Sequence, residues 1–331
     1  MKTSHPAVSR PRIVSQAIAI SSVAITVLTL PIGSAHAQNV FTGADGVSPL
    51  TGGDPGAYDF SDGNNWTGGV PNLQTSGTTQ INTPGATVDY YAGTYGDLKI
   101  GSGGTLEITN GTFDQVTSIN WIQMFGNATI LVDGGTFEQG SDTNNPFNLN
   151  GTTGNAFNIT GGSAIFDEDF DVDTGFTYTQ TGGTVTITGN ELDYNSPDGT
   201  IIDGGVLNVN LITGVNSDNT GVLTIEGGTI NLGSGGIYAE GSTTPVNFTA
   251  GSTGEVTFPA VDFSTDTLQG WINNGGFSYN GATDPSDLQV VSSGSLNIVE
   301  AIAPVPEPQT WAMFFGGIAS LCFFRRTFRR K

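Results

Sequence analysis

The chain has few of the residues on which most enzyme sites and covalent cross-links depend. Among 331 residues there is one cysteine, Cys322, and there are two histidines, His5 and His36. Nine Lys and Arg residues stand against thirty Asp and Glu residues. Between residues 38 and 307 the chain keeps all thirty carboxylates and a single base, Lys99, so the formal charge of this part is −29.

These absences narrow the chemistry of residues 38–307. Without His, Cys or Arg, this part has no Ser-His-Asp or Cys-His catalytic group, no His/Cys zinc site, no arginine clamp on phosphate and no disulfide. Its negative charge repels nucleic acid and anionic lipid. Carboxylate, hydroxyl, amide and aromatic chemistry remains, and it includes a carboxylate pair of the glycosidase type. We expect no cofactor, with calcium as the one candidate ligand ion.

The N-terminus has the organisation of a secretory signal peptide. A basic start is followed by a mostly apolar run from Ile13 to Leu30 and by Ala35-His36-Ala37, an A-x-A cleavage site. The pattern predicts a signal peptide over residues 1–37, export through the Sec translocon and cleavage after Ala37. An uncleaved anchor is the alternative, because the apolar run is long.

The C-terminus combines a short motif, an apolar run and a basic cluster. Pro306 and Pro308 hold Glu307 in an extended, accessible segment. The sixteen residues from Gln309 to Phe324 are fewer than the roughly twenty of a full membrane span. A helix of this length spans the membrane only if the bilayer thins locally or the flanking basic side chains snorkel to its surface. Positive charge stays on the cytoplasmic side. It comes from Arg325, Arg326, Arg329, Arg330 and Lys331.

This arrangement resembles the PEP-CTERM sorting signal. The motif consists of Val305, Pro306, Glu307 and Pro308. The resemblance implies that residues 301–331 anchor the chain transiently in a bacterial inner membrane and that an exosortase-type enzyme recognises the motif and removes the tail. A short buried helix with a charged end is the alternative interpretation.

Double glycines punctuate the middle of the chain. They occur at 103–104, 134–135, 161–162, 182–183, 204–205 and 227–228, at separations of 31, 27, 21, 22 and 23 residues. An apolar-x-apolar pattern follows most of them, as in Val185 and Ile187 or Leu207 and Val209, whereas Gln139 interrupts it after Phe137. A glycine turn followed by a short alternating strand at about this period is typical of a solenoid.

We therefore predict an all-β fold in which residues 81–300 form a β-helix or solenoid-like stack, with almost no helix outside the two termini. An antiparallel β-sandwich is the alternative. Residues 38–80 lack the repeat and are expected to cap the stack. Their Asn65-Trp66-Thr67-Gly68-Gly69-Val70-Pro71 segment resembles the leading segment of surface proteins with autotransporter-type β repeats, and Trp66 is expected to cover the apolar end of the core.

One acidic segment is a candidate calcium site. Asp169, Asp171 and Asp173 alternate with Phe170 and Val172, which places the three carboxylates on one face of a strand. Calcium prefers oxygen ligands of this kind. A solvated acidic edge that discourages strand addition is the alternative, and we favour it over a dedicated calcium site.

Together these features predict an exported, non-enzymatic protein. The resemblance to PEP-CTERM proteins implies that it belongs to the cell surface or extracellular matrix and is associated with exopolysaccharide or biofilm. Exopolysaccharide is the expected partner, in addition to the translocon and the processing enzyme. Two other functions stay open. One is a glycan-binding adhesin, and the other is a β-helical polysaccharide hydrolase that uses two carboxylates.

Overall fold

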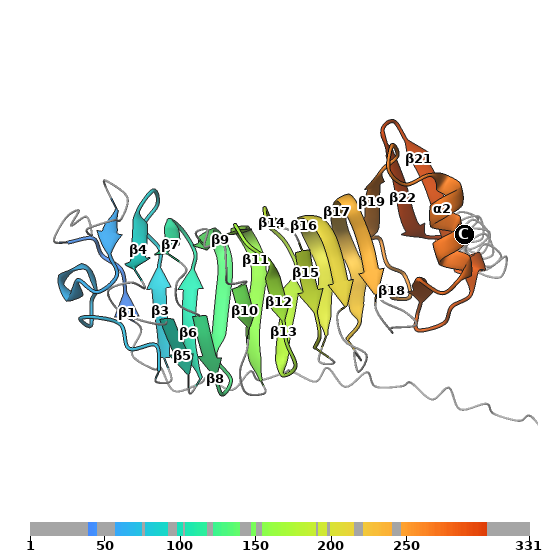
Figure 1. Cartoon of the computed structure of the whole chain (residues 1–331). Helices are drawn as coiled ribbons and strands as arrows, with labels where there is room; N and C mark the ends of the chain where they lie inside the picture. The colour runs from blue at the N-terminus through green and yellow to red at the C-terminus, as the bar shows by residue number, and fades with distance from the viewer. Residues whose placement is uncertain are drawn as a thin grey trace, which may run out of the picture. The chain divides into compact units, whose positions relative to one another are not determined.

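The computed structural model describes residues 39–44, 57–74, 77–91, 98–101, 103–117, 122–139, 147–149, 154–189, 191–196, 199–214, 221–239 and 246–302. Within them the chain forms a β-solenoid of about six turns (Figure 1). The predicted all-β solenoid is thereby confirmed. The antiparallel sandwich is wrong, because strands of successive coils pair in parallel.

Each regular coil contributes one strand segment to each of three faces. The first face stacks segments that begin a coil. It consists of β1 (Asn39–Val40), β3 (Gly77–Ile81), β6 (Gly104–Ile108), the start of β9 (Thr129–Gln139), the start of β11 (Asn155–Phe166), β13 (Phe176–Gln180), the starts of β16 (Thr200–Gly214) and β17 (Leu223–Ala239), β18 (Val246–Phe248) and β20 (Phe277–Tyr279).

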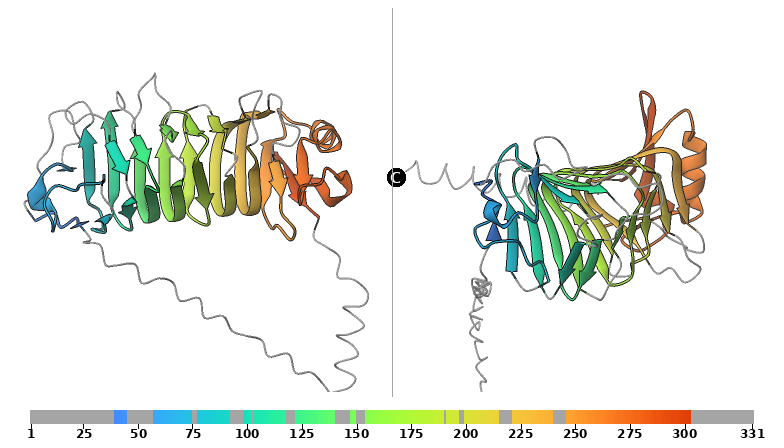
Figure 2. Two further views of the ribbon diagram at one scale, coloured as in Figure 1. Left: turned by 90° about the horizontal axis from the view of Figure 1, so that it is seen from below. Right: turned by 60° about the vertical axis from the view of Figure 1, so that its left-hand side comes forward.

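The second face follows the first after a glycine corner. It consists of β2 (Tyr58–Asp59), β4 (Thr87–Tyr91), β7 (Thr112–Thr117), the ends of β9 and β11, β14 (Thr184–Ile187), the middle parts of β16 and β17, and β19 (Glu255–Pro259). Figure 2 shows the strands of successive coils lying side by side.

The third face closes each coil. It consists of β5 (Leu98–Gly101), β8 (Ile122–Phe125), β10 (Phe147–Leu149), β12 (Phe170–Val172), β15 (Glu191–Tyr194) and the ends of β16 and β17. The strands alternate in burial, as in β13 and β15, so one set of side chains fills the interior and the other faces outward.

Glycine at the corner between the first two faces lets successive coils approach closely. Gly162, Gly183, Gly205 and Gly228 have φ between 65° and 73°. A Cβ on Gly183 would lie 2.7 Å from the carbonyl oxygen of Gly162 in the preceding coil. Any other residue here would meet both an unfavourable backbone conformation and the neighbouring main chain.

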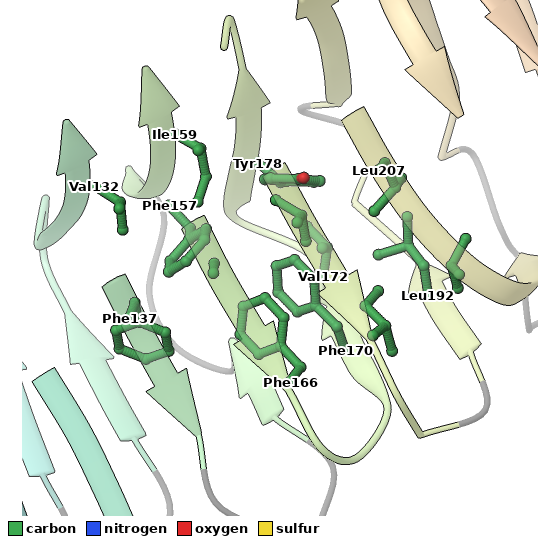
Figure 3. Close-up of a cluster of buried hydrophobic side chains, with 14 of the residues drawn as sticks. Val132, Phe137, Phe157, Ile159, Phe166, Phe170, Val172, Tyr178, Leu192 and Leu207 are labelled. Atoms are coloured by element: carbon green, nitrogen blue, oxygen red, sulfur yellow. The ribbon is translucent and has the colours of Figure 1, made fainter. Parts of the chain in front are cut away.

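The interior is a set of apolar columns that run from coil to coil. One column contains Phe137, Ala164, Val185, Leu207, Ile230 and Val256, all fully buried. Aromatic rings fill the middle coils (Figure 3). Phe166 stacks on Phe170 with ring centroids 4.5 Å apart, and Phe170 lies edge-on to Tyr178 at 5.2 Å. Each coil depends on its neighbours to bury these side chains.

One predicted alignment is wrong. Gly104 does not lie at the same corner as the later double glycines, because it pairs with Gly77 at the start of the first face and Leu106 pairs with Ile130. The corner of that coil is made by Gly111, whose φ is 80°, and Phe113 takes the place beside Phe137. A single glycine provides the positive φ that the turn requires.

Aromatic side chains of residues 39–74 lie at the N-terminal end of the stack. Trp66 directly follows the short 3-10 helix η1 (Gly63–Asn65) and is buried. Its ring packs edge-on against Phe41 and Phe60, at 5.3 and 5.1 Å. The indole Nε1 donates a 2.9 Å hydrogen bond to the carbonyl of Phe60, so the buried polar group is satisfied.

The C-terminal end departs from the repeat. Helix α2 (Thr265–Asn273) follows β19 and precedes β20, where earlier coils have a third-face strand. Ser264 caps the helix by accepting a hydrogen bond from the backbone N–H of Thr267, and Leu268 and Ile272 are buried. One short α-helix among the described residues agrees with the prediction of almost no helix. Its position was not predicted, although the capping Ser264 was a readable signal.

An antiparallel sheet completes this end. After the 3-10 helix η2 (Pro285–Asp287), β21 (Leu288–Ser293) and β22 (Leu296–Ala301) form a hairpin. Strand β22 also pairs antiparallel with β19, so it covers the edge of the second face. Covering an edge with a strand of opposite direction ends the parallel stack.

Candidate functional site

The predicted processing sites lie outside the described residues. This applies to the signal cleavage site at Ala35 and Ala37, to the sorting motif from Val305 to Pro308, and to the basic tail from Arg325 to Lys331. The last described residue is Ile302, which follows β22 directly. Across the part of the chain that the structure describes, no helix has the length and apolar character needed to cross a membrane.

The acidic segment of the third face contains carboxyl groups whose pKa values are raised by burial and by neighbouring carboxylates. As predicted, Phe170 and Val172 of β12 are buried, and Asp171 between them faces outward. Asp169 and Asp173 flank the strand. The three carboxylates are close enough for Asp169 and Asp173 both to act on the pKa of Asp171.

The parallel register adds two carboxylates from the next coil. Asp171 lies beside Asp193, as Phe170 lies beside Leu192 and Val172 beside Tyr194. Glu191 begins the same strand, β15, and its backbone N–H donates a 3.0 Å hydrogen bond to Oδ1 of Asp169. Two neighbouring strands therefore present acidic side chains on one surface, which is unfavourable for like charges.

Burial and charge together shift the protonation of this group. The pKa of Asp171 is raised to about 7, chiefly by burial, and the remainder of the shift comes from the neighbouring charges of Asp193, Asp173, Asp169 and Glu191. The pKa of Glu191 is also raised, first by burial and then by Asp169 and Asp193, whereas a hydrogen bond with Thr213 lowers it. Near neutral pH, Asp171 is therefore partly protonated.

Hydrogen bonds hold several of these carboxylates in place. Asp193 accepts a 2.9 Å bond from Nδ2 of Asn195, and Asp167 accepts a 3.1 Å bond from the hydroxyl of Thr188 in the following coil. Within the described ranges, no three or more His, Cys, Asp or Glu side chains are grouped as a metal site requires. Calcium binding at Asp169, Asp171 and Asp173 therefore stays a prediction.

Sequence reasoning missed Glu191 and Asp193 as members of this group. The signal was present, because Asp169 and Glu191, and Asp171 and Asp193, are each separated by 22 residues, one of the separations between the double glycines. Projecting the acidic segment forward by one coil would have found both.

A second column of carboxylates crosses the N-terminal coils on the second face. Asp59 lies beside Asp89, Asp89 beside Asp114, and Asp114 beside Glu138. Asp89 is almost completely buried, and Asp59 accepts hydrogen bonds from the backbone and hydroxyl of Ser61. The parallel register thus aligns carboxylates of successive coils on the second face as well as on the third.

Comparison with known proteins gives no relative from which a function could be inferred. No family model matches the chain, and neither the curated proteins nor the solved structures contain a significant match.

Proposed function

We propose that the chain is the precursor of an exported, exosortase-processed structural protein of the cell surface or extracellular matrix. The observation that carries the proposal is the order of parts at the C-terminus. The Val305-Pro306-Glu307-Pro308 motif comes first, the apolar run follows, and the five basic residues end the chain. The predicted N-terminal signal peptide supports export of the chain through the Sec translocon.

The fold is consistent with a structural role. A solenoid grows by adding coils, and its stability comes from contacts between neighbouring coils. The passenger, residues 38–300, combines this architecture with a surface rich in hydroxyl, amide and carboxylate groups. Such a surface suits a hydrated, polysaccharide-rich surrounding, which is why we place the processed protein at the cell surface or in the matrix.

Replacement of Glu307 by Ala in the native host tests the processing step. The mass of the C-terminal peptide of the exported protein is measured for wild type and for Glu307→Ala. We expect wild type to lack residues 325–331 and the variant to keep them. Thr310→Ala, just beyond the motif, is the matched control and should be processed normally. Retention of the tail by wild type would overturn the proposal.

A carboxylate-based polysaccharide hydrolase is the second candidate, and one observation favours it. Asp171 has a pKa of about 7 and lies beside Asp193, which is the kind of pair in which one acid is protonated and its neighbour ionised. Release of reducing sugar from neutral and anionic polysaccharides is measured. Turnover that disappears in both Asp171→Asn and Asp193→Asn, while melting curves show that both variants are at least as stable as wild type, would favour the enzyme over the structural protein.

A further inference from the structure

The outward side of the first face carries regular columns of side chains that are uncharged except for Glu107. In one column, Thr78 lies beside Thr105, Thr105 beside Thr129, Thr129 beside Ala156, and Ala156 beside Thr177. All five positions are partly exposed, whereas their sequence neighbours in the strands point into the core. Neighbouring strands are about 4.8 Å apart, so four hydroxyls repeat along the solenoid at multiples of this spacing.

A second column runs parallel to the first, two residues further along each strand. Its polar members are hydroxyl and amide side chains, with one carboxylate, and Leu131 and Ile201 are interspersed among them. The polar members are Gln80, Glu107, Asn158, Thr179, Thr224 and Asn247. The carboxylate of Glu107 already accepts a 3.1 Å hydrogen bond from Gln80.

The low charge of these two columns contrasts with the rest of the solenoid. The second face has the column from Asp59 to Glu138, and the third face has Asp171 and Asp193. Other carboxylates stand beyond the two columns, at the corner with the second face, as Asp203 does. A ligand on the first face therefore meets hydrogen-bonding groups and aliphatic patches, while the negative charge around it repels polyanions.

The same columns are a poor surface for a protein partner. Protein interfaces depend on a few large anchors, chiefly Trp, Tyr and Arg, and the described members of the two columns include none of these residues. Many weak, identical contacts at a constant repeat instead suit a polymer with a repeat of its own, because linked contacts add through their effective concentration.

We propose that the first face binds an extended neutral polysaccharide that lies along the coil axis and exchanges hydrogen bonds with successive strands. This inference rests on the proposed location of the protein in a polysaccharide-rich matrix. It names the class of glycan and the face that takes it up.

The test is native gel electrophoresis of the exported protein, purified from its host, in gels that contain a defined polysaccharide. Dextran, galactomannan and hydroxyethyl cellulose are the neutral probes, alginate is the anionic probe and soluble chitosan is the cationic probe. We expect at least one neutral polymer to slow wild type and alginate to leave it unaffected. The retardation should increase with the chain length of the neutral polymer.

Two double variants of equal net charge locate the binding face. Thr105→Asp with Thr179→Asp places charge in the two columns and should weaken binding of the neutral polymer at least about fivefold. Thr112→Asp with Thr184→Asp places the same charge at partly exposed positions of the second face and should bind as wild type does. Melting curves of both variants check that each remains folded.

Three results would overturn the inference. They are no retardation by any neutral polymer, equal loss of binding in the two double variants, and retardation by chitosan alone, which would show non-specific charge attraction. None of them bears on tail removal, because that step is read from the C-terminal mass. A protein that is processed at Glu307 but binds no neutral glycan would keep the proposed function and lose this inference.

Discussion

Asp171 and Asp193 occupy neighbouring positions of one parallel ladder, so two carboxylates of successive coils lie side by side on the third face. The pKa of Asp171 is raised to about 7, chiefly by burial. Between about pH 4 and pH 7, the folded protein therefore keeps a proton on Asp171 that the unfolded chain has already released. Since the unfolded state binds fewer protons in this window, this group makes the fold less stable as the pH rises through it.

Asp171→Asn should remove that pH-dependent loss. At pH 8 we expect the variant to be more stable than wild type by about 1 to 2 kcal/mol, a value reduced from the full shift because the side chain is partly exposed. At pH 4 the two proteins should melt alike. Chemical denaturation at both pH values checks this. Asp262→Asn, at an exposed position of the C-terminal end, is the control, and an equal gain there would assign the effect to net charge.

The buried columns predict a strong difference between adjacent residues of β14. Val185 lies in the core between Ala164 and Leu207, whereas Thr186 faces outward. Val185→Asp should lower the free energy of unfolding by about 3 to 5 kcal/mol, because it buries an unpaired charge. Thr186→Asp should cost less than about 1 kcal/mol. Urea unfolding of both variants measures the difference, and similar losses would contradict the register.

The corner glycines allow a second stability test. Gly183→Ala places a Cβ against the main chain of the preceding coil and requires a positive φ. We expect it to destabilise the fold by at least about 2 kcal/mol. Gly251 has a φ of 81° with open space around the added Cβ, so Gly251→Ala isolates the backbone strain alone and should cost about 1 kcal/mol. Equal costs would mean that the coils do not approach as closely as described.

Salt should stabilise the passenger by screening its negative charge. Calcium should raise the melting temperature by about 2 °C beyond sodium at the same ionic strength, if the acidic group of the third face takes up the ion. The double variant Asp171→Asn with Asp193→Asn should lose this excess and keep the general effect of salt. Superimposable curves in the two salts would leave the group as a solvated acidic surface.

The apolar alternation and the glycine corners were sufficient to predict the solenoid and most of one core column. Val185, Leu207 and Ile230 lie in the predicted register because the coils that contain them have nearly constant length. The alignment failed at the glycine pair 103–104, where coil length varies and the single Gly111 makes the corner instead. A periodicity argument cannot assign a corner when the length of the coil changes.

The acidic group of the third face shows a related limit of prediction from the sequence. Alternation within one strand places Asp171 outward and Phe170 inward, and the structure agrees. The pairing of Asp171 with Asp193 depends on the stacking of one coil on the next, which a single strand does not reveal. Local patterns therefore predict the direction of a side chain, whereas its neighbours depend on contacts between distant parts of the sequence.

The two ends of the stack differ from its middle, and this has an evolutionary consequence. Trp66 and its aromatic partners close one end, and β22 with α2 closes the other, while the coils between them contact mainly the coil before and the coil after. A duplication of one coil, such as residues 184–205, would present the same surfaces to its neighbours as the original. We therefore expect that whole coils can be inserted or removed while both closing segments stay unchanged.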